Sequence, residues 1–197
     1  PDSDPHESDC PIDLRHLNEK EAGVNGRVRR QGSGFVTGDG KPVRFWIVEG
    51  NSLHGMDKSK IDYMARQLAK YGVNMVRIGI IPLYEAYNKG EMEEFDRARD
   101  KLQYTVAALK KQGIYTYIAH LLRHTRRTLP GKVAGPGYGE KVNPYGLSFF
   151  NQHFRDHYMG YVGKTLTAEN PYTGMPLAKD PAVAFLEVQN ETGLLFW

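Results

Sequence analysis

Short apolar runs alternate with amphipathic stretches along most of the 197-residue chain, and this alternation limits the fold more than any other feature. Each apolar run has the length of a buried strand, and each amphipathic stretch carries apolar side chains at helical spacing. In chain order these segments are a helix over 58–71, a strand over 73–81, a helix over 96–112, a strand over 114–120, a helix over 147–167 and a strand over 182–189. Strands that alternate with helices form βαβ units, so the sequence predicts an α/β fold with a parallel sheet.

The segment ahead of the first helix has a different pattern. Residues 34–37 and 43–48 are apolar runs on either side of an Asp39-Gly40 turn, which predicts a β-hairpin. Residues 1–31 are polar and rich in charge, so we interpret them as a loose leader with one short helix. The predicted domain then comprises residues 32–197. Trp46, within the hairpin, is expected to pack at the bottom of the fold.

Two architectures fit the alternation, an open doubly wound sheet and a (β/α)8 barrel. The open sheet normally has a glycine-rich phosphate loop after its first strand, and residues 49–56 lack that glycine spacing. Polar residues instead follow the strand ends, where barrels build their active sites. They are Asn51 and His54 after the first strand, Arg77 late in the second, His120 after the third, and Asn190 and Glu191 after the fourth. The sequence therefore predicts a (β/α)8 TIM barrel, of which this chain supplies about the first four strands plus an N-terminal β-hairpin.

Composition excludes several classes of partner. Lys and Arg total 26 against 23 Asp and Glu, and a formal charge of +3 is too small to favour nucleic acid. The basic residues near Arg123 fit a solvated loop as well as an anionic partner. No apolar run is long enough to span a bilayer, so we expect no membrane partner. One cysteine, Cys10, excludes an internal disulfide.

Four segments then resemble a known family. In order they are DGKPVRFW at 39–46, AKYGVNMVR at 69–77, LKKQGIY at 109–115 and VAFLEVQNE at 183–191. With these segments in register, the chain is similar to clan A of the glycoside hydrolases, in the style of family 5 cellulases and mannanases, over roughly residues 33–197.

The resemblance implies a retaining glycosidase that acts on β-linked polysaccharide or oligosaccharide. It makes Glu191 the general acid/base, lets Asn190 bind the sugar 2-hydroxyl and lets Arg77 position the nucleophile. The nucleophile would be a second glutamate at the end of the seventh strand, which this chain does not contain. We expect no metal ion and no cofactor. Secretion or export to the periplasm is an expectation from the resemblance alone.

The charged candidates have alternative interpretations. Glu191 on its own is equally a surface glutamate that caps a loop. Glu187 shares a strand face with Glu191 by alternation, and we interpret it as a buried structural partner of Arg77 rather than a catalytic group. Arg77 lies in an apolar strand and needs an anionic partner, which fits an active-site role or a structural ion pair.

The histidines and aromatic residues leave similar choices open. His120 is interpreted as a sugar ligand; with His124 it has the spacing of a zinc pair on a helix, but it ends a strand. His54 is a second candidate sugar ligand, and Asn51 a third. Trp197 is a candidate platform for sugar stacking, with core packing as the alternative.

Two function classes remain. The first is the glycosidase, with the C-terminal half of the barrel supplied by the same or a second chain as partner and carbohydrate as substrate. The second is a non-catalytic carbohydrate-binding or scaffold half-barrel. Other barrel enzymes would need a metal cluster or a phosphate loop, which the sequence lacks. Four strands leave two sheet edges and one apolar face uncovered, so we expect the 197 residues alone to self-associate or to be partly unfolded, and to be inactive as a retaining glycosidase.

Overall fold

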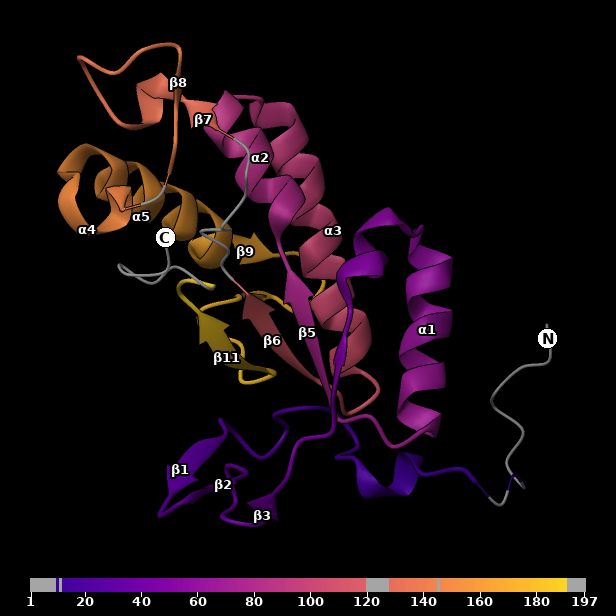
Figure 1. Cartoon of the computed structure of the whole chain (residues 1–197). Coiled ribbons are helices and arrows are strands. Elements are labelled where there is room, and N and C mark those ends of the chain that lie inside the picture. The colour runs from indigo at the N-terminus through magenta and orange to yellow at the C-terminus, as the bar shows by residue number, and fades with distance from the viewer. Residues whose placement is uncertain (1–9, 11, 120–127, 145, 191–197) are drawn as a thin grey trace.

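The structure is a computed structural model of the chain, and it describes residues 10, 12–119, 128–144 and 146–190 (Figure 1). Its helices are α1 (Lys58–Lys70), α2 (Ile81–Lys89), α3 (Met92–Lys110), α4 (Leu147–Phe150) and α5 (Gln152–Thr167), with the short 3-10 helices η1 (Arg15–Leu17), η2 (Asn51–Gly55) and η3 (Gly131–Val133). Its strands are β1 (Arg29–Gln31), β2 (Gly34–Val36), β3 (Pro42–Val43), β4 (Ile47–Glu49), β5 (Met75–Gly79), β6 (Tyr115–Ala119), β7 (Leu129–Pro130), β8 (Lys141–Val142), β9 (Glu169–Asn170), β10 (Met175–Pro176) and β11 (Val183–Glu187). Within these ranges no helix is long and apolar enough to cross a membrane.

Four parallel strands form the central sheet, and they lie in the order of the chain: β4, β5, β6, β11. Helices connect each strand to the next, as Figure 1 shows. An open doubly wound sheet reverses its strand order, whereas a barrel adds each new strand on the same side of the last. The sheet therefore has the winding of part of a barrel, and the predicted α/β fold with a parallel sheet is confirmed.

Helix α1 follows the predicted pattern closely. Asp57 caps its N-terminus, where the side-chain Oδ1 accepts a hydrogen bond from the backbone N–H of Lys60 at 2.9 Å. Gly72 follows its C-terminus with φ of +76°, a left-handed conformation that glycine adopts without strain. The helix predicted over 58–71 is therefore confirmed, with one residue fewer.

Helix α2 was not predicted, because no element was assigned between the strand expected over 73–81 and the helix expected over 96–112. Pro82 lies in the first turn of the helix, where its missing N–H would have no partner in any case. Gly90 ends the helix with φ of +84°. Helix α3 starts soon afterwards at Met92, ahead of the predicted start at residue 96. The sequence signal for α2 was the proline near its start and the glycine at its end.

The helix predicted over 147–167 is divided at Asn151. This residue has extended dihedral angles, with φ of −109° and ψ of 108°, so α4 ends there. Its side-chain Oδ1 accepts a hydrogen bond from the backbone N–H of Phe154 at 2.7 Å and thereby caps α5. Asn151 thus starts a second helix inside the segment whose apolar spacing predicted one continuous helix.

The predicted hairpin forms in part. β2 pairs with β3, and β1 adds a third antiparallel strand from the segment that we assigned to the leader. The strand predicted over 43–48 is divided, since β3 joins this small sheet and β4 joins the parallel one. Trp46 lies between them, directly before β4 and so at the predicted bottom of the sheet, but it is 59% exposed and is not packed there.

The described part of the leader packs against the N-terminal ends of the parallel strands. Leu14 donates a backbone hydrogen bond to the carbonyl of Lys70 at 2.9 Å, and the side-chain amide of Asn18 donates to the carbonyl of Val73 at 2.9 Å. The hydroxyl of Tyr115 donates to the carboxylate of Glu19. These residues are a folded part of the domain rather than the loose leader that we predicted, because hydrogen bonds tie them to the end of α1, to the segment before β5 and to β6.

Apolar side chains cover both faces of the parallel sheet. On one face Val76, Ile78 and Ile118 pack with the helices in the larger core. On the other face Met75 and Tyr115 pack in a smaller core with residues that precede the first helix. Figure 1 shows the antiparallel sheet below the parallel strands, at their N-terminal ends. The antiparallel sheet therefore leaves the C-terminal ends of the parallel strands open to polar groups.

Candidate active site

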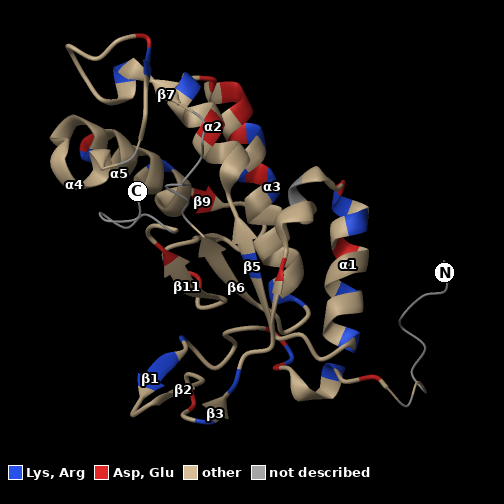
Figure 2. Cartoon of the chain, in the orientation of Figure 1, with Lys and Arg blue, Asp and Glu red and all other residues tan. Residues whose placement is uncertain are grey.

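The four parallel strands contain three charged residues, and all three belong to one network. Glu49 ends β4, Arg77 lies in β5 and Glu187 ends β11. Figure 2 shows that most charged residues lie on the helices, the antiparallel sheet and the loops, whereas the parallel strands are largely uncharged. Two of these charges end their strands and the third lies in the middle of β5, so the network lies toward the end of the sheet where barrel proteins place their sites.

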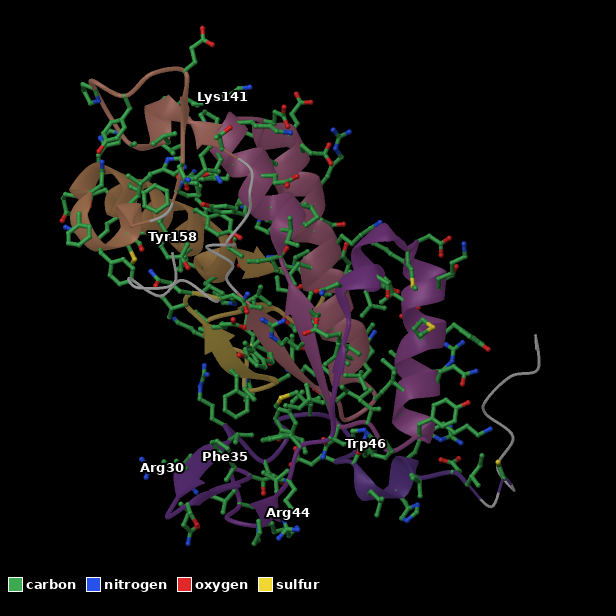
Figure 3. All side chains as sticks on the ribbon, viewed as in Figure 1. Arg30, Phe35, Arg44, Trp46, Lys141 and Tyr158 are labelled. Carbon is green, nitrogen blue, oxygen red and sulfur yellow. The ribbon has the colours of Figure 1, made fainter. Side chains whose placement is uncertain are left out.

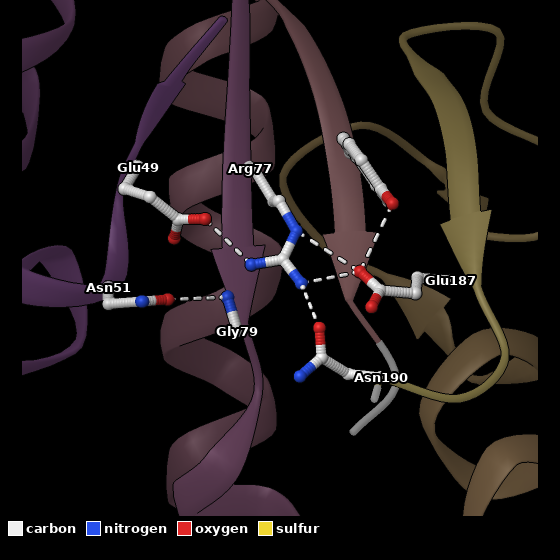
Figure 4. A network of polar contacts seen from close by, with 7 residues as sticks. Glu49, Asn51, Arg77, Gly79, Glu187 and Asn190 are labelled. Atoms are coloured by element: carbon white, nitrogen blue, oxygen red, sulfur yellow. Dashed lines mark hydrogen bonds and ion pairs between the residues drawn. The ribbon is translucent and has the colours of Figure 1, made fainter. Parts of the chain in front are cut away.

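Arg77 is the centre of the network (Figure 4). Its Nη1 donates to Glu49 Oε1 at 2.6 Å, and its Nε and Nη2 donate to Glu187 Oε2 at 3.1 and 2.5 Å. Nη2 also donates to the side-chain Oδ1 of Asn190 at 3.1 Å. The predicted partnership of Arg77 with Glu187 is confirmed. Glu49 was not predicted as a site residue, although its position just before Gly50 and Asn51 placed it at the same strand end.

A β-bulge in β11 brings Glu187 to this face. Val183 lies opposite Thr116 and Phe185 lies opposite Tyr117, so two steps of β11 match one step of β6. Val183 packs in the core on the helix side, whereas Phe185 packs in the smaller core on the other side. Regular pairing would have placed Phe185 and Glu187 on the helix side, because side chains alternate along a strand. The bulge thus explains the encounter with Arg77.

Tyr117 of β6 completes the layer around Arg77. Its hydroxyl donates to Glu187 Oε2 at 3.1 Å, and the guanidinium lies 5.4 Å from the centre of its ring. Burial raises the pKa of Tyr117, and the hydrogen bond to the carboxylate raises it further. The hydroxyl therefore stays a proton donor at neutral pH. Sequence analysis treated Tyr117 only as a strand residue.

The network is shielded from water unevenly. The side chains of Arg77 and Glu187 are 21% and 15% exposed, whereas that of Glu49 is 53% exposed. Burial acts to lower the pKa of Arg77, but hydrogen bonds with Glu187 and Glu49 outweigh it and raise that pKa. The guanidinium is thus a permanent cation, held more firmly on its Glu187 side.

Helix α5 fixes the segment that follows β11. The hydroxyl of Tyr158 donates to the backbone carbonyl of Val188, one residue past the end of the strand. Figure 3 labels Tyr158 on this helix, above the sheet. Arg77 thus bonds to the side chain of Asn190, and Tyr158 holds the backbone two residues before it.

Asn51 links two neighbouring strand ends. Its side-chain Oδ1 accepts a hydrogen bond from the backbone N–H of Gly79 at 2.8 Å, which ties the start of η2 to the end of β5 (Figure 4). This contact gives Asn51 a structural task. Its predicted contact with a sugar stays a prediction.

Several predicted site residues lie outside the described part of the chain. They are Glu191, His120 and Trp197. The backbone of His54 is in η2, but the placement of its side chain is not described. Their roles stay predictions. Across the described ranges no group of three or more His, Cys, Asp or Glu side chains is placed to hold a metal ion.

The network offers oriented hydrogen-bonding groups at one end of the sheet. A guanidinium has five donors and no acceptor, and an asparagine side chain has both. Charge-assisted bonds to two carboxylates restrict how the guanidinium can turn. Such a site is suited to bind the hydroxyl groups of a polar ligand.

The fold and this site define an α/β protein whose parallel sheet resembles part of a mannanase TIM barrel, with an added N-terminal antiparallel sheet. The chain is similar to an endo-1,4-β-mannanase from Rhizomucor miehei, with a TM-score of 0.62 and 19% identity over 84% of this chain. It is also similar to a hyperthermostable endo-1,4-β-D-mannanase from Thermotoga petrophila RKU-1, with a TM-score of 0.59 and 19% identity over 76% of this chain.

A further structure, an endo-β-1,4-mannanase from Thermotoga petrophila, matches 78% of this chain with a TM-score of 0.60 and 19% identity. The chain spans 48%, 45% and 36% of the lengths of these three mannanases. No model of a known protein family matches the chain, and no curated protein matches it either. At this identity the likeness concerns the fold.

Proposed function

We propose that residues 32–197 form the N-terminal half of the catalytic domain of a retaining β-glycoside hydrolase. The observation that carries the proposal is the Arg77 network, which lies at the C-terminal end of a parallel sheet with the fold of part of a mannanase. Barrel enzymes assemble their catalytic groups at that end. The substrate is a β-linked polysaccharide or oligosaccharide.

Glu191 is the general acid/base in this proposal. It directly follows Asn190, whose side chain is bonded to Arg77. Glu187 is less suited to deliver a proton, because its Oε2 already accepts hydrogen bonds from Arg77 and Tyr117. Retaining hydrolysis needs a second carboxyl group about 5–5.5 Å from the acid/base, as a nucleophile that attacks the anomeric carbon.

The substrate is held by polar and aromatic side chains around this pair of carboxyl groups. Asn190 donates to the hydroxyl next to the anomeric carbon, and Arg77 orients the groups around it. The remaining proposed sugar contacts are those of His120, His54, Asn51 and Trp197. Catalysis of this type uses no metal ion and no cofactor.

The nucleophile and the other strands come from a partner segment. Four parallel strands cannot close a barrel of eight, and the matched mannanases are about two to three times as long as the region they share with this chain. We propose that the C-terminal half, in the same or a second chain, pairs with the free edges of β4 and β11. The 197 residues alone then lack retaining activity.

The intact mass of the natural gene product is the first measurement, followed by hydrolysis assays on β-mannan and β-glucan with the wild type and Glu191→Gln. We expect a product longer than this chain that hydrolyses at least one polymer. Loss of the acid/base should lower kcat by about 100- to 10,000-fold. Asp156→Asn, an exposed change on α5, serves as the control and should retain activity.

Two results would overturn the assignment. Full activity in Glu191→Gln would remove Glu191 from the chemistry. A natural product of only this length, inactive but with measurable polysaccharide binding, would favour a non-catalytic carbohydrate-binding half-barrel.

A further inference from the structure

We propose that Glu187 is a positioning residue that acts through Arg77 and makes Asn190 a hydrogen-bond donor to the substrate. This inference rests on the proposed function for the identity of the substrate, a sugar hydroxyl. The relay itself consists of contacts between described residues and can be tested without any activity.

Only one end of the Asn190 side chain can bond to Arg77. The guanidinium has donors and no acceptor, so only the carbonyl oxygen of the carboxamide can bond to it. Asn190 Oδ1 accordingly lies 3.1 Å from Arg77 Nη2. Figure 4 shows the amide nitrogen of Asn190 on the side away from the guanidinium. Asn190 therefore presents N–H groups, rather than an oxygen, on that side.

Glu187 holds Nη2 in place. Glu187 Oε2 accepts from Nη2 at 2.5 Å and from Nε at 3.1 Å, so two nitrogens along one edge of the guanidinium are tied to a single oxygen. The hydroxyl of Tyr117 bonds to the same oxygen at 3.1 Å. Because Nη2 serves both Glu187 and Asn190, the carboxylate of Glu187 sets the position from which Asn190 is oriented.

Glu187 and Glu49 bond to different branches of the guanidinium. Glu49 bonds to Nη1 at 2.6 Å, on the other branch of the guanidinium, and its side chain is 53% exposed against 15% for Glu187. Both residues supply one negative charge to the same cation. Glu187 alone shares the nitrogen that bonds to Asn190. If Glu187 only balanced the charge of Arg77, its removal and the removal of Glu49 would have the same effect on Asn190. If Glu187 positions Nη2, its removal has the larger effect.

Nuclear magnetic resonance of the ¹⁵N-labelled natural gene product tests the relay directly. The signals are those of the Asn190 side-chain amide and the Arg77 Nε–H, with Asn190→Asp used for assignment. Glu187→Gln keeps a neutral acceptor, and Glu187→Met keeps the length without an acceptor. We expect the Asn190 amide shifts to change most in Glu187→Met, less in Glu187→Gln and least in Glu49→Gln. Equal changes in Glu187→Gln and Glu49→Gln, or no change at Asn190, would overturn the relay.

Kinetics of the active natural protein measure how strongly kcat/KM depends on the 2-hydroxyl of the substrate. A merely structural role of Glu187 would not change that dependence. The probes are 4-nitrophenyl β-mannobioside and its analogue without the 2-hydroxyl at the scissile sugar. In the wild type, removal of that hydroxyl should lower kcat/KM about 10- to 100-fold, the effect of one lost hydrogen bond in a polar site. In Glu187→Gln the parent substrate should react more slowly, and the hydroxyl should matter by only a few fold.

The two experiments fail in different ways. A wild type that hydrolyses neither these probes nor β-mannan and β-glucan would reject the proposed function, while the resonance data would still decide the relay. An unchanged hydroxyl dependence in Glu187→Gln would reject the relay even in an active enzyme.

Discussion

At the scale of single residues, Gly113 shows how tightly the start of the chain is built into the fold. It joins α3 to β6 with φ of +71°. A Cβ atom at this position would lie 1.9 Å from the backbone carbonyl oxygen of Glu19. The glycine therefore allows the segment around Glu19 to pass directly over the turn, and a side chain would push that segment away.

A matched pair of glycines tests this contact. Gly174 has nearly the same φ, +72°, but nothing within 4 Å of the Cβ position. We expect Gly174→Ala to lower the free energy of unfolding by about 1–2 kcal/mol through backbone strain alone. Gly113→Ala should lower it by about 1–3 kcal/mol more through overpacking. Urea denaturation followed by circular dichroism measures both. Equal losses would mean that the segment around Glu19 is not packed on the turn.

At the scale of elements, α2 and α5 meet through a group of tyrosines beside the candidate site. The rings of Tyr84 and Tyr161 lie 5.5 Å apart, and those of Tyr158 and Tyr161 lie 6.1 Å apart. Burial raises the pKa of Tyr84 to about 12 and raises the pKa values of Tyr158 and Tyr161 as well. The contact between the two helices thus depends on neutral phenols.

This arrangement predicts a loss of stability in alkali. In the unfolded chain these tyrosines ionise near pH 10, the unperturbed value. In the folded chain they stay neutral to a higher pH, so the unfolded state binds fewer protons above pH 10 and stability falls as pH rises toward about 12. Absorbance at 295 nm should show the exposed tyrosines ionising first and the buried ones ionising together with the loss of the circular dichroism signal. Ionisation of all 12 tyrosines near pH 10 with an intact circular dichroism spectrum would contradict this assignment.

The same elements show what the sequence can and cannot predict. Periodicity identified α1 and most of α3, because a buried face imposes a regular spacing on its residues, and apolar runs identified β5, β6 and β11. It missed α2, where a proline start and a glycine end frame a short segment that is buried on several sides. The bulge between Val183 and Phe185 has no signal of its own, because only the pairing with β6 defines it. The predicted face of Glu187 is therefore correct, although the bulge that places Glu187 on that face was not predicted.

For the site, the sequence could predict which residues follow the strands but not which atoms meet. Arg77 and Glu187 were paired from the need of a buried cation for an anion. Glu49, Tyr117 and Tyr158 entered the site only through the register of four strands and the packing of α5. Such contacts join residues far apart in the sequence, and strand register is a property of the assembled sheet.

At the scale of the whole molecule, the parallel sheet ends in two free edges. Within the described ranges β4 and β11 each pair on one side only. Apolar side chains accompany both edges: Trp46 and Ile47 at β4, Leu186 and Val188 at β11, all of them exposed. Figure 3 shows Trp46 near the foot of the sheet, where no neighbouring strand covers it. Unpaired edges with exposed apolar residues favour association with other chains.

We therefore expect the 197-residue chain by itself to associate, with a mass by light scattering above its own 22.3 kDa. A charged side chain on an edge strand opposes pairing at that edge, so Leu186→Lys should shift the distribution toward the monomer. Tyr71→Lys, at an exposed residue that follows α1, adds the same charge away from both edges and should leave the distribution unchanged. Two results would contradict this account of the edges. One is a wild-type chain that stays a stable monomer; the other is an equal response to both substitutions, which would place the contact elsewhere on the surface.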